Sequence, residues 1–382
     1  MKLFDLPVIY FHSIAPRQNY NWSYSHLTLE LHFFEELLKY LRRNKYETIL
    51  LDEFIDNANE ISSDKVIALS FDDGYLDNWI YVFPLLKKFE FNATIFISPE
   101  TVDKQNIIRP NLDDYWLGKI NWNDLDRWGY LSWQEMLEMQ KTGLFSFQSH
   151  TMSHTKYFIS EKINGFHHPG SNRIYPLWNT NPELKPYYIG NPSFNNILPF
   201  GYPLFEEESA VTAHRIFIND DFNSEVVDAL KNYDWSQGDK DAYKIIQPLL
   251  DNYTKKNILI HHRENEREHQ QRINYEVVQS KKIMEMQLGQ PVTICCWPHG
   301  NNSEYLHDIA VKNGYKATTI GKFHGPFDPA QRIGPRIGVK KYYPNNYLSL
   351  LRIFMRIKAY QKKFPYYSLK PVYHLIKHQN KI

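Results

Sequence analysis

The sequence has few cysteines, no long apolar run and no clear secretory signal. Its 382 residues include only two cysteines, Cys295 and Cys296, which are adjacent, so a disulfide framework is excluded. No stretch of about 18 apolar residues occurs, which argues against a transmembrane helix. The first residues, MKLFDLPVIYFHSIAPRQ, carry charge within the apolar part and lack a small-residue cleavage site. We therefore expect a cytoplasmic protein.

The whole sequence has almost no net charge, but its C-terminal part is basic. Hydrophobic residues make up 42%, charged residues 23%, and the net charge is +1, as in ordinary globular proteins. From Lys340 to Ile382 there are ten Lys or Arg and no Asp or Glu. This segment either contacts an anionic membrane surface at the inner membrane or docks on the acidic body of the protein. We expect no nucleic-acid partner.

Short apolar runs alternate with amphipathic runs along much of the chain. Strand then helix, repeated about seven times, predicts a parallel sheet in an α/β fold and favours a barrel. The predicted strands are Val8–His12, Tyr46–Leu51, Val66–Phe71, Ala93–Ser98, Phe145–Ser149, Val292–Trp297 and Ala317–Ile320. The predicted helices are His32–Asn44, Asn78–Phe89, Ser132–Thr142, Ile273–Leu288 and Ser303–Asn313.

One long stretch breaks this alternation. Residues 160–255 are rich in Pro, Asn and Tyr, and a structureless loop of this length is unusual in a compact domain. We predict an insertion that caps the strand ends, with aromatic residues that pack it onto the barrel or line a sugar site. The predicted organisation is therefore a discontinuous barrel (1–159 and 256–340), an insertion (160–255) and a basic aromatic tail (341–382).

Two acidic residues stand side by side at the end of a buried strand. The stretch VIALSFDDG places Asp72 and Asp73 directly after the predicted strand Val66–Phe71. Two like charges at this position repel each other. A folded protein that keeps both must supply a positive partner for at least one of them.

A pair of histidines follows another predicted strand. The stretch SHTMSH contains His150 and His154, and on a helical turn two residues four apart share one face. Both imidazoles can then reach one metal ion at the same rim as Asp73. Two histidines and one carboxylate leave room for water and substrate, as in catalytic metal sites. The second carboxylate stays free to act as general base toward a metal-bound water.

These motifs resemble a known family. SFDDG and SHTMSH are similar to motifs of the polysaccharide deacetylases of the NodB-homology group, carbohydrate esterase family 4. The resemblance covers residues 5–100, 130–157 and 270–340 and implies a distorted (β/α)7 barrel of the NodB-homology type. VIYFHSI resembles an early motif of a permuted subgroup that includes enzymes deacetylating poly-N-acetylglucosamine.

The resemblance also implies roles for individual residues. Asp72 is the expected general base, and Asp73, His150 and His154 are the expected metal ligands. Zn²⁺ is the default ion, while Co²⁺, Ni²⁺, Mn²⁺ and Fe²⁺ also suit these ligands. His12, in the early motif, is the expected general acid, and its alternatives are His299, His324 and the pair His261–His262.

The remaining predicted site residues lie in the downstream part of the chain or beside the histidine motif. Pro298-His299-Gly300 replaces the usual Pro-Tyr-Gly turn of the family, so the main-chain N–H of His299 is the candidate oxyanion donor. Trp133 resembles a tryptophan beside the family's site, with a core role equally open. Trp297 occupies a position where some members carry an arginine that holds the base. Arg336 is a substitute for that arginine or a member of an ordinary ion pair. Trp133, Trp297 and Arg336 are our predicted substrate-binding residues.

We expect a metal-dependent hydrolase that removes an acetyl or formyl group from an amino sugar in surface-glycan biosynthesis. The expected substrate is a nucleotide-linked or lipid-linked N-acylated amino sugar. A sugar de-N-formylase and an inactive sugar-binding relative are the alternatives. A retaining glycosidase is disfavoured, because its carboxylates stand about 5 Å apart across the sugar bond and the histidine pair would have no role.

Overall fold

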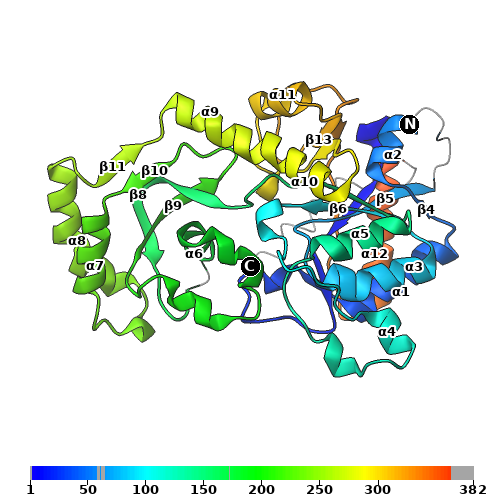
Figure 1. Ribbon diagram of the computed structural model, residues 1–382, viewed down its shortest axis with the longest axis horizontal. Coiled ribbons are helices and arrows are strands. Elements are labelled where there is room, and N and C mark those ends of the chain that lie inside the picture. Colours follow the sequence, from blue (N-terminus) through cyan, green and yellow to red (C-terminus); the bar gives the residue numbers. More distant parts are fainter. Residues whose placement is uncertain (1, 58–60, 62–64, 172, 363–382) are drawn as a thin grey trace.

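A parallel sheet forms the centre of the protein. The computed structural model describes residues 2–57, 61, 65–171 and 173–362 (Figure 1). Nine strands lie in the order β14-β13-β12-β7-β6-β5-β1-β15, with β4 paired to β5 outside this path. Their bounds are β1 Val8–Phe11, β4 Glu47–Thr48, β5 Val66–Phe71, β6 Ala93–Ile97, β7 Phe145–Ser149, β12 Ile294–Cys295, β13 Ala317–Thr319, β14 Arg332–Ile333 and β15 Ile337–Gly338. Every residue of β5, β6 and β7 is buried, as expected for strands covered on both faces.

The two edges of the sheet meet through one short segment. β14 pairs with β13 at one edge, and β15 pairs with β1 at the other. Only Gly334, Pro335 and Arg336 separate β14 from β15, so residues 332–338 act as a single interrupted strand between β13 and β1. The sheet is therefore closed into a distorted (β/α)7 barrel, which confirms the predicted fold.

Helices cover the outside of the barrel (Figure 1). In α1, Phe33, Leu37 and Leu41 recur every four residues and are buried in the main core. Ser132 and Glu135 form a capping box that starts α5 at Trp133. The helices around the barrel are α1 Leu31–Arg43, α2 Leu51–Asn57, α3 Phe83–Phe89, α4 Leu112–Trp116, α5 Trp133–Lys141, α9 Glu266–Asn274, α10 Ser280–Leu288, α11 Glu304–Lys312 and α12 Asn346–Tyr360.

The long segment between β7 and α9, called the excursion below, has a small hydrophobic core of its own. It contains two antiparallel pairs, β8 with β9 and β10 with β11, and a hydrophobic cluster that includes Phe166, Phe205 and Phe222. Its elements are β8 Lys156–Phe166, α6 Tyr175–Thr180, β9 Pro203–Ser209, β10 Ile216–Ile218, α7 Asp220–Ala229, α8 Lys240–Lys255 and β11 Ile260–Arg263. The predicted insertion, 160–255, lies within these limits. Figure 1 shows α7 and α8 far from the barrel strands, whereas α6 lies close to them.

The segment predicted as a tail begins with a helix that belongs to the barrel. α12 packs against α1, and its residues Leu350, Ile353 and Ile357 are buried in the main core. Residues 363–382 of the predicted tail lie outside the described residues. Among the helices described, none is both long and apolar enough to cross a bilayer. A short parallel pair, β2 (Ser13–Ala15) with β3 (Thr28–Glu30), follows β1.

Candidate active site

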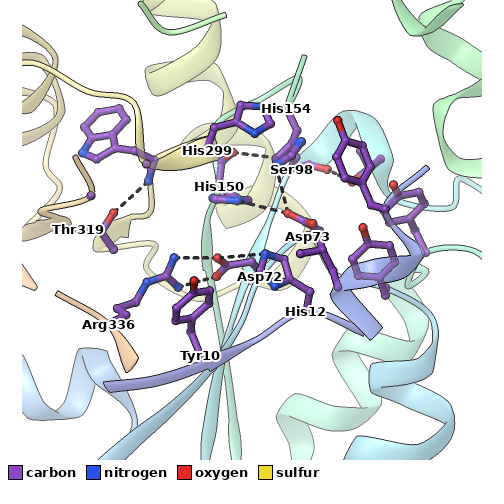
Figure 2. A pocket seen from close by; sticks show the side chains of 18 of the residues that line it. Tyr10, His12, Asp72, Asp73, Ser98, His150, His154, His299, Thr319 and Arg336 are labelled. Carbon is purple, nitrogen blue, oxygen red and sulfur yellow. Dashed lines mark hydrogen bonds and ion pairs between the residues drawn. The ribbon is translucent and has the colours of Figure 1, made fainter. Parts of the chain in front are cut away.

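A cavity of about 450 Å³ lies at the carboxyl ends of the barrel strands. His12 follows β1, Asp72 and Asp73 follow β5, His150 follows β7, and other lining residues follow β6, β12 and β13. Parallel strands bring their carboxyl ends to one rim. Figure 2 shows these side chains pointing toward one another from separate parts of the chain.

Three of these side chains converge on a small volume. The Asp73 Oδ1 atom is 3.3 Å from His150 Nε2 and 3.1 Å from His154 Nε2, and the three candidate ligand atoms lie within 4.8 Å of one another. Asp73 Oδ1 is buried without a hydrogen bond of normal geometry. Zinc bonds of about 2.1 Å in a tetrahedron place ligand atoms about 3.4 Å apart, so these residues fit a divalent cation.

A hydrogen bond to His150 and the charges around Asp73 put both residues in the protonation states that bind a cation. His150 Nδ1 lies 2.8 Å from the Cys296 carbonyl oxygen; an Nδ1–H donated there leaves the Nε2 lone pair facing Asp73. Burial raises the pKa of Asp73, but His154 and His150 outweigh burial and hold that pKa well below its ordinary value. Asp73 is therefore ionised at neutral pH, as a carboxylate ligand of a cation must be.

The loop that carries the histidines differs from the prediction. His150 and His154 do not share a helical turn but lie in the irregular segment between β7 and β8. Thr151 has φ 62° and His154 has φ 48°, and Asp73 has φ 74° on the facing loop. These left-handed conformations are costly for residues other than glycine. They turn the chain so that side chains four residues apart still face the same point.

Asp72 has a different partner, the guanidinium of Arg336. Arg336 Nη1 donates to Asp72 Oδ1 at 2.6 Å, and Nη2 donates to Oδ2 at 2.7 Å. Burial raises the pKa of Asp72, but the charge and hydrogen bonds of Arg336 outweigh burial and lower that pKa. Arg336 thus orients and ionises the predicted base, as a substitute for the arginine that holds the base in some family members would. Arg336 also lines the cavity, and its assignment to substrate binding stays a prediction. Its guanidinium stacks on the ring of Tyr10, 4.6 Å from the centroid.

His12 lies on the same side of the cavity as Asp72. Its Nε2 atom is 3.9 Å from Asp72 Oδ2, and its ring meets the edge of Tyr10. Burial lowers the pKa of His12, although Asp73 and Asp72 oppose the shift. His12 is therefore neutral at neutral pH and stands beside the predicted base.

The opposite wall contains His299 and two tyrosines. His299 has φ 58°, and its ring packs edge-on against His154 with centroids 4.8 Å apart. Tyr175 Oη is 3.3 Å from His299 Nε2, and Tyr24 Oη donates to Tyr175 Oη at 2.6 Å. Burial lowers the pKa of His299 to about 2, so this imidazole is neutral.

Several aromatic residues of this wall were missed as site residues. The cavity is lined by Trp22, Tyr24, Tyr75, Tyr130, Tyr175 and Trp178. The last two belong to α6, so the insertion supplies part of the active-site wall. For these two residues the sequence signal was the richness of residues 160–255 in Pro, Asn and Tyr, which does not distinguish packing residues from lining residues.

The other predicted residues fall into two groups. Trp297 lines the cavity, but only 1% of its surface is exposed, so its ring mainly supports the wall. Trp133 lies outside the lining and packs against the main core at the start of α5, which corrects its predicted role. The alternative acids His261 and His262 lie on β11 in the excursion, where His262 pairs with Glu268.

Comparisons with known proteins agree with this site. Residues 59–170 match the family described as polysaccharide deacetylase. This part of the chain is therefore similar to that family. A putative polysaccharide deacetylase of Bacillus subtilis, YxkH, is 28% identical over 194 residues, which are 47% of this chain and 58% of that protein. The poly-β-1,6-N-acetyl-D-glucosamine N-deacetylase of Staphylococcus aureus is 30% identical over 147 residues, which are 38% of this chain and 41% of that protein.

A solved structure shows the same fold. A de-N-acetylase from Aggregatibacter actinomycetemcomitans aligns with a TM-score of 0.53 at 17% identity, over 91% of this chain and 99% of that chain. The alignments to the two curated relatives span only about half the length of those proteins. Asp72, Asp73, His150 and His154 all lie within residues 59–170, the part of the chain that matches the polysaccharide deacetylase family.

The geometry predicts separate effects for the two neighbouring aspartates. Asp73→Ala removes one of three ligands, so we expect the variant to lose bound metal after dialysis against a dilute Zn²⁺ or Co²⁺ buffer. Asp72→Asn leaves the three ligand atoms in place and should keep stoichiometric metal. Inductively coupled plasma mass spectrometry of both purified variants measures the difference. Full metal content in Asp73→Ala would contradict the ligand assignment.

Proposed function

We propose that this protein is a metal-dependent hydrolase that removes an N-acyl group, acetyl or formyl, from an amino sugar. The observation that carries the proposal is the pair Asp72 and Asp73, in which one carboxylate is held by Arg336 and the other faces two imidazoles. Asp73, His150 and His154 would hold the ion. A divalent cation bound there supplies a Lewis acid that acidifies a coordinated water and polarises the amide carbonyl.

Asp72 is suited to remove the proton from the attacking water. It is ionised because Arg336 lowers its pKa, and the bidentate contact fixes the direction of its oxygens. A general base must stand within hydrogen-bond reach of its proton. Asp72 stands close to the volume that such a water would occupy, because one of its carboxylate oxygens lies within 4.8 Å of a ring nitrogen of His150.

His12 is suited to deliver a proton to the departing amine. It is neutral before the reaction, so the proton that it delivers is one taken up during turnover. Protonated Asp72, 3.9 Å away, is its nearest source. The tetrahedral intermediate places negative charge on the former carbonyl oxygen, and the main-chain N–H of His299 is our candidate donor to that oxygen.

The wall of the cavity supports an amino sugar as substrate. Trp22, Tyr24, Tyr75, Tyr130, Tyr175 and Trp178 offer aromatic faces and hydroxyl groups, which suit the apolar and polar sides of a sugar ring. The name of the Staphylococcus aureus relative, which specifies an N-acetylglucosamine polymer, supports the same class. The nucleotide or lipid carrier and the cytoplasmic location remain predictions.

Turnover of defined amino sugars tests the proposal. Metal-loaded protein is incubated with N-acetylglucosamine oligomers, nucleotide-linked N-acetylglucosamine and N-formyl analogues, and mass spectrometry detects loss of the acyl group. We expect release of acetate or formate that stops with a chelator and returns with Zn²⁺ or Co²⁺. Asp72→Asn should lower turnover by roughly 100-fold or more, since general-base catalysis contributes that much. Full activity of Asp72→Asn, or no turnover of any of these sugars, would contradict the proposal.

The Tyr24–Tyr175–His299 contacts predict a kinetic effect of the insertion. Tyr175→Phe keeps the buried ring but removes the hydroxyl that contacts His299, so we expect kcat/KM to fall about tenfold, the value of one hydrogen bond of about 1.4 kcal/mol. Steady-state kinetics on the substrate found above measures this change.

A second tyrosine of the same aromatic cluster provides a matched control. The Tyr188 hydroxyl donates only to the Leu177 carbonyl at 3.2 Å. Tyr188→Phe should therefore keep the kinetics of the unmodified protein, even where it lowers the melting temperature as much as Tyr175→Phe. Equal kinetics for the two variants would remove Tyr175 from the active site.

A further inference from the structure

Helix α12 has one face in the core and one face in solvent. Leu350, Ile353 and Ile357 are buried. On the outward side, 65% of Tyr347, 48% of Leu348 and 37% of Leu351 is exposed, and Tyr343, just before the helix, is 39% exposed. Tyr343, Tyr347, Leu348 and Leu351 are called the α12 outer face below.

This outer face differs from the usual surface of a helix. A helix on a globular protein normally presents polar residues to water. A single exposed leucine needs no explanation, but large apolar side chains gathered in one short segment are typical of an interaction surface. Leu348 and Leu351 are three residues apart and Tyr347 and Leu351 four apart, so their side chains share one side of α12.

The segment around the outer face carries charge of one sign. Residues 340–362 contain six Lys or Arg and no Asp or Glu. Two acidic residues from other elements reach the segment: Glu30 pairs with Lys341, and Asp5 pairs with Lys362. The remaining Lys and Arg outnumber these acids. Four further lysines and no acidic residue follow in the sequence from 363 to 382.

One cation is fixed at the edge of the outer face. The Arg352 guanidinium lies 4.2 Å from the ring centroid of Tyr342, and its Nη1 donates to Tyr343 Oη at 3.1 Å. These contacts place a positive charge beside Tyr343. An apolar strip with a cation at its edge, in a segment of one sign of charge, is complementary to a surface that is apolar inside and anionic outside.

We propose that the α12 outer face docks on an anionic lipid surface. Leu348, Leu351 and Tyr347 would enter the boundary between headgroups and acyl chains, while Arg352 and the neighbouring lysines would contact lipid phosphates. A protein partner is less favoured, because the charge is of one sign over the whole segment and continues beyond the helix. The docking does not depend on the hydrolase activity proposed above.

Vesicle binding by the full chain tests this docking. The protein is sedimented with phosphatidylcholine vesicles that contain phosphatidylglycerol, and with pure phosphatidylcholine vesicles. We expect binding to the anionic vesicles only, with affinity that falls as salt rises. Leu348→Glu and Leu351→Glu place a negative charge on the apolar strip, so each should weaken binding roughly tenfold or more, with an unchanged melting temperature.

A control variant makes the same change elsewhere. Met286, on α10, is 71% exposed, and Met286→Glu should bind the anionic vesicles as the unmodified protein does. Failure of the unmodified protein to bind, equal binding to neutral vesicles, or unaltered binding by Leu348→Glu would each overturn the proposal. A lower melting temperature or a change of oligomeric mass in Leu348→Glu would overturn it too, because the face would then be covered by this chain or by a second copy.

Discussion

The site depends on how two adjacent carboxylates are kept ionised and apart. Asp72 and Asp73 are both buried, and two such charges side by side destabilise a folded protein unless each is compensated. Arg336 compensates Asp72 through two parallel hydrogen bonds. His150 and His154 face Asp73 and, with it, form a site that suits a cation. In the proposed function, one carboxylate binds the cation and the other takes part in proton transfer.

A sharp turn of the backbone after β5 separates the side chains of Asp72 and Asp73. Asp73 and Gly74 both have positive φ, 74° and 69°, so the chain turns sharply at the end of β5. A Cβ on Gly74 would lie 2.5 Å from Ile97 Cδ1, so a larger residue would displace that side chain as well as strain the backbone at positive φ. The turn directs the side chains of Asp72 and Asp73 to different partners, and the left-handed His154 completes the cluster from the facing loop. Strain of this kind is typical of functional sites, where the surrounding fold enforces it.

Much of the fold and of the ligand set could be predicted from local patterns. β5 and β7 match the predicted ranges. β5, VIALSF, is an almost unbroken apolar run, and β7, FSFQS, alternates apolar and polar residues, which are two patterns typical of strands. Asp73, His150 and His154 were found because each follows such a strand. Short strands such as β12 were predicted too long, because Val292 and Trp297 are buried by packing outside the sheet ladder.

The remaining site residues depend on contacts that no local pattern reveals. Arg336 is 264 residues from Asp72, and it reaches the site only because residues 332–338 close the barrel between β13 and β1. Tyr175 reaches His299 from the insertion, and its role depends on how a separate small core packs against the barrel. Trp133 illustrates the reverse case, since a tryptophan near a motif in sequence packs against the core, partly buried, and lies outside the cavity lining.

The central claim is that Asp73 and the histidine pair bind a cation while Asp72 remains with Arg336. A crystal structure of the protein grown with Co²⁺, with anomalous scattering measured on both sides of the cobalt absorption edge, tests it directly. The account predicts one anomalous peak bonded to Asp73, His150 and His154, with the Asp72–Arg336 contact intact. A peak bonded to Asp72 instead, or no peak among these three side chains, would contradict it.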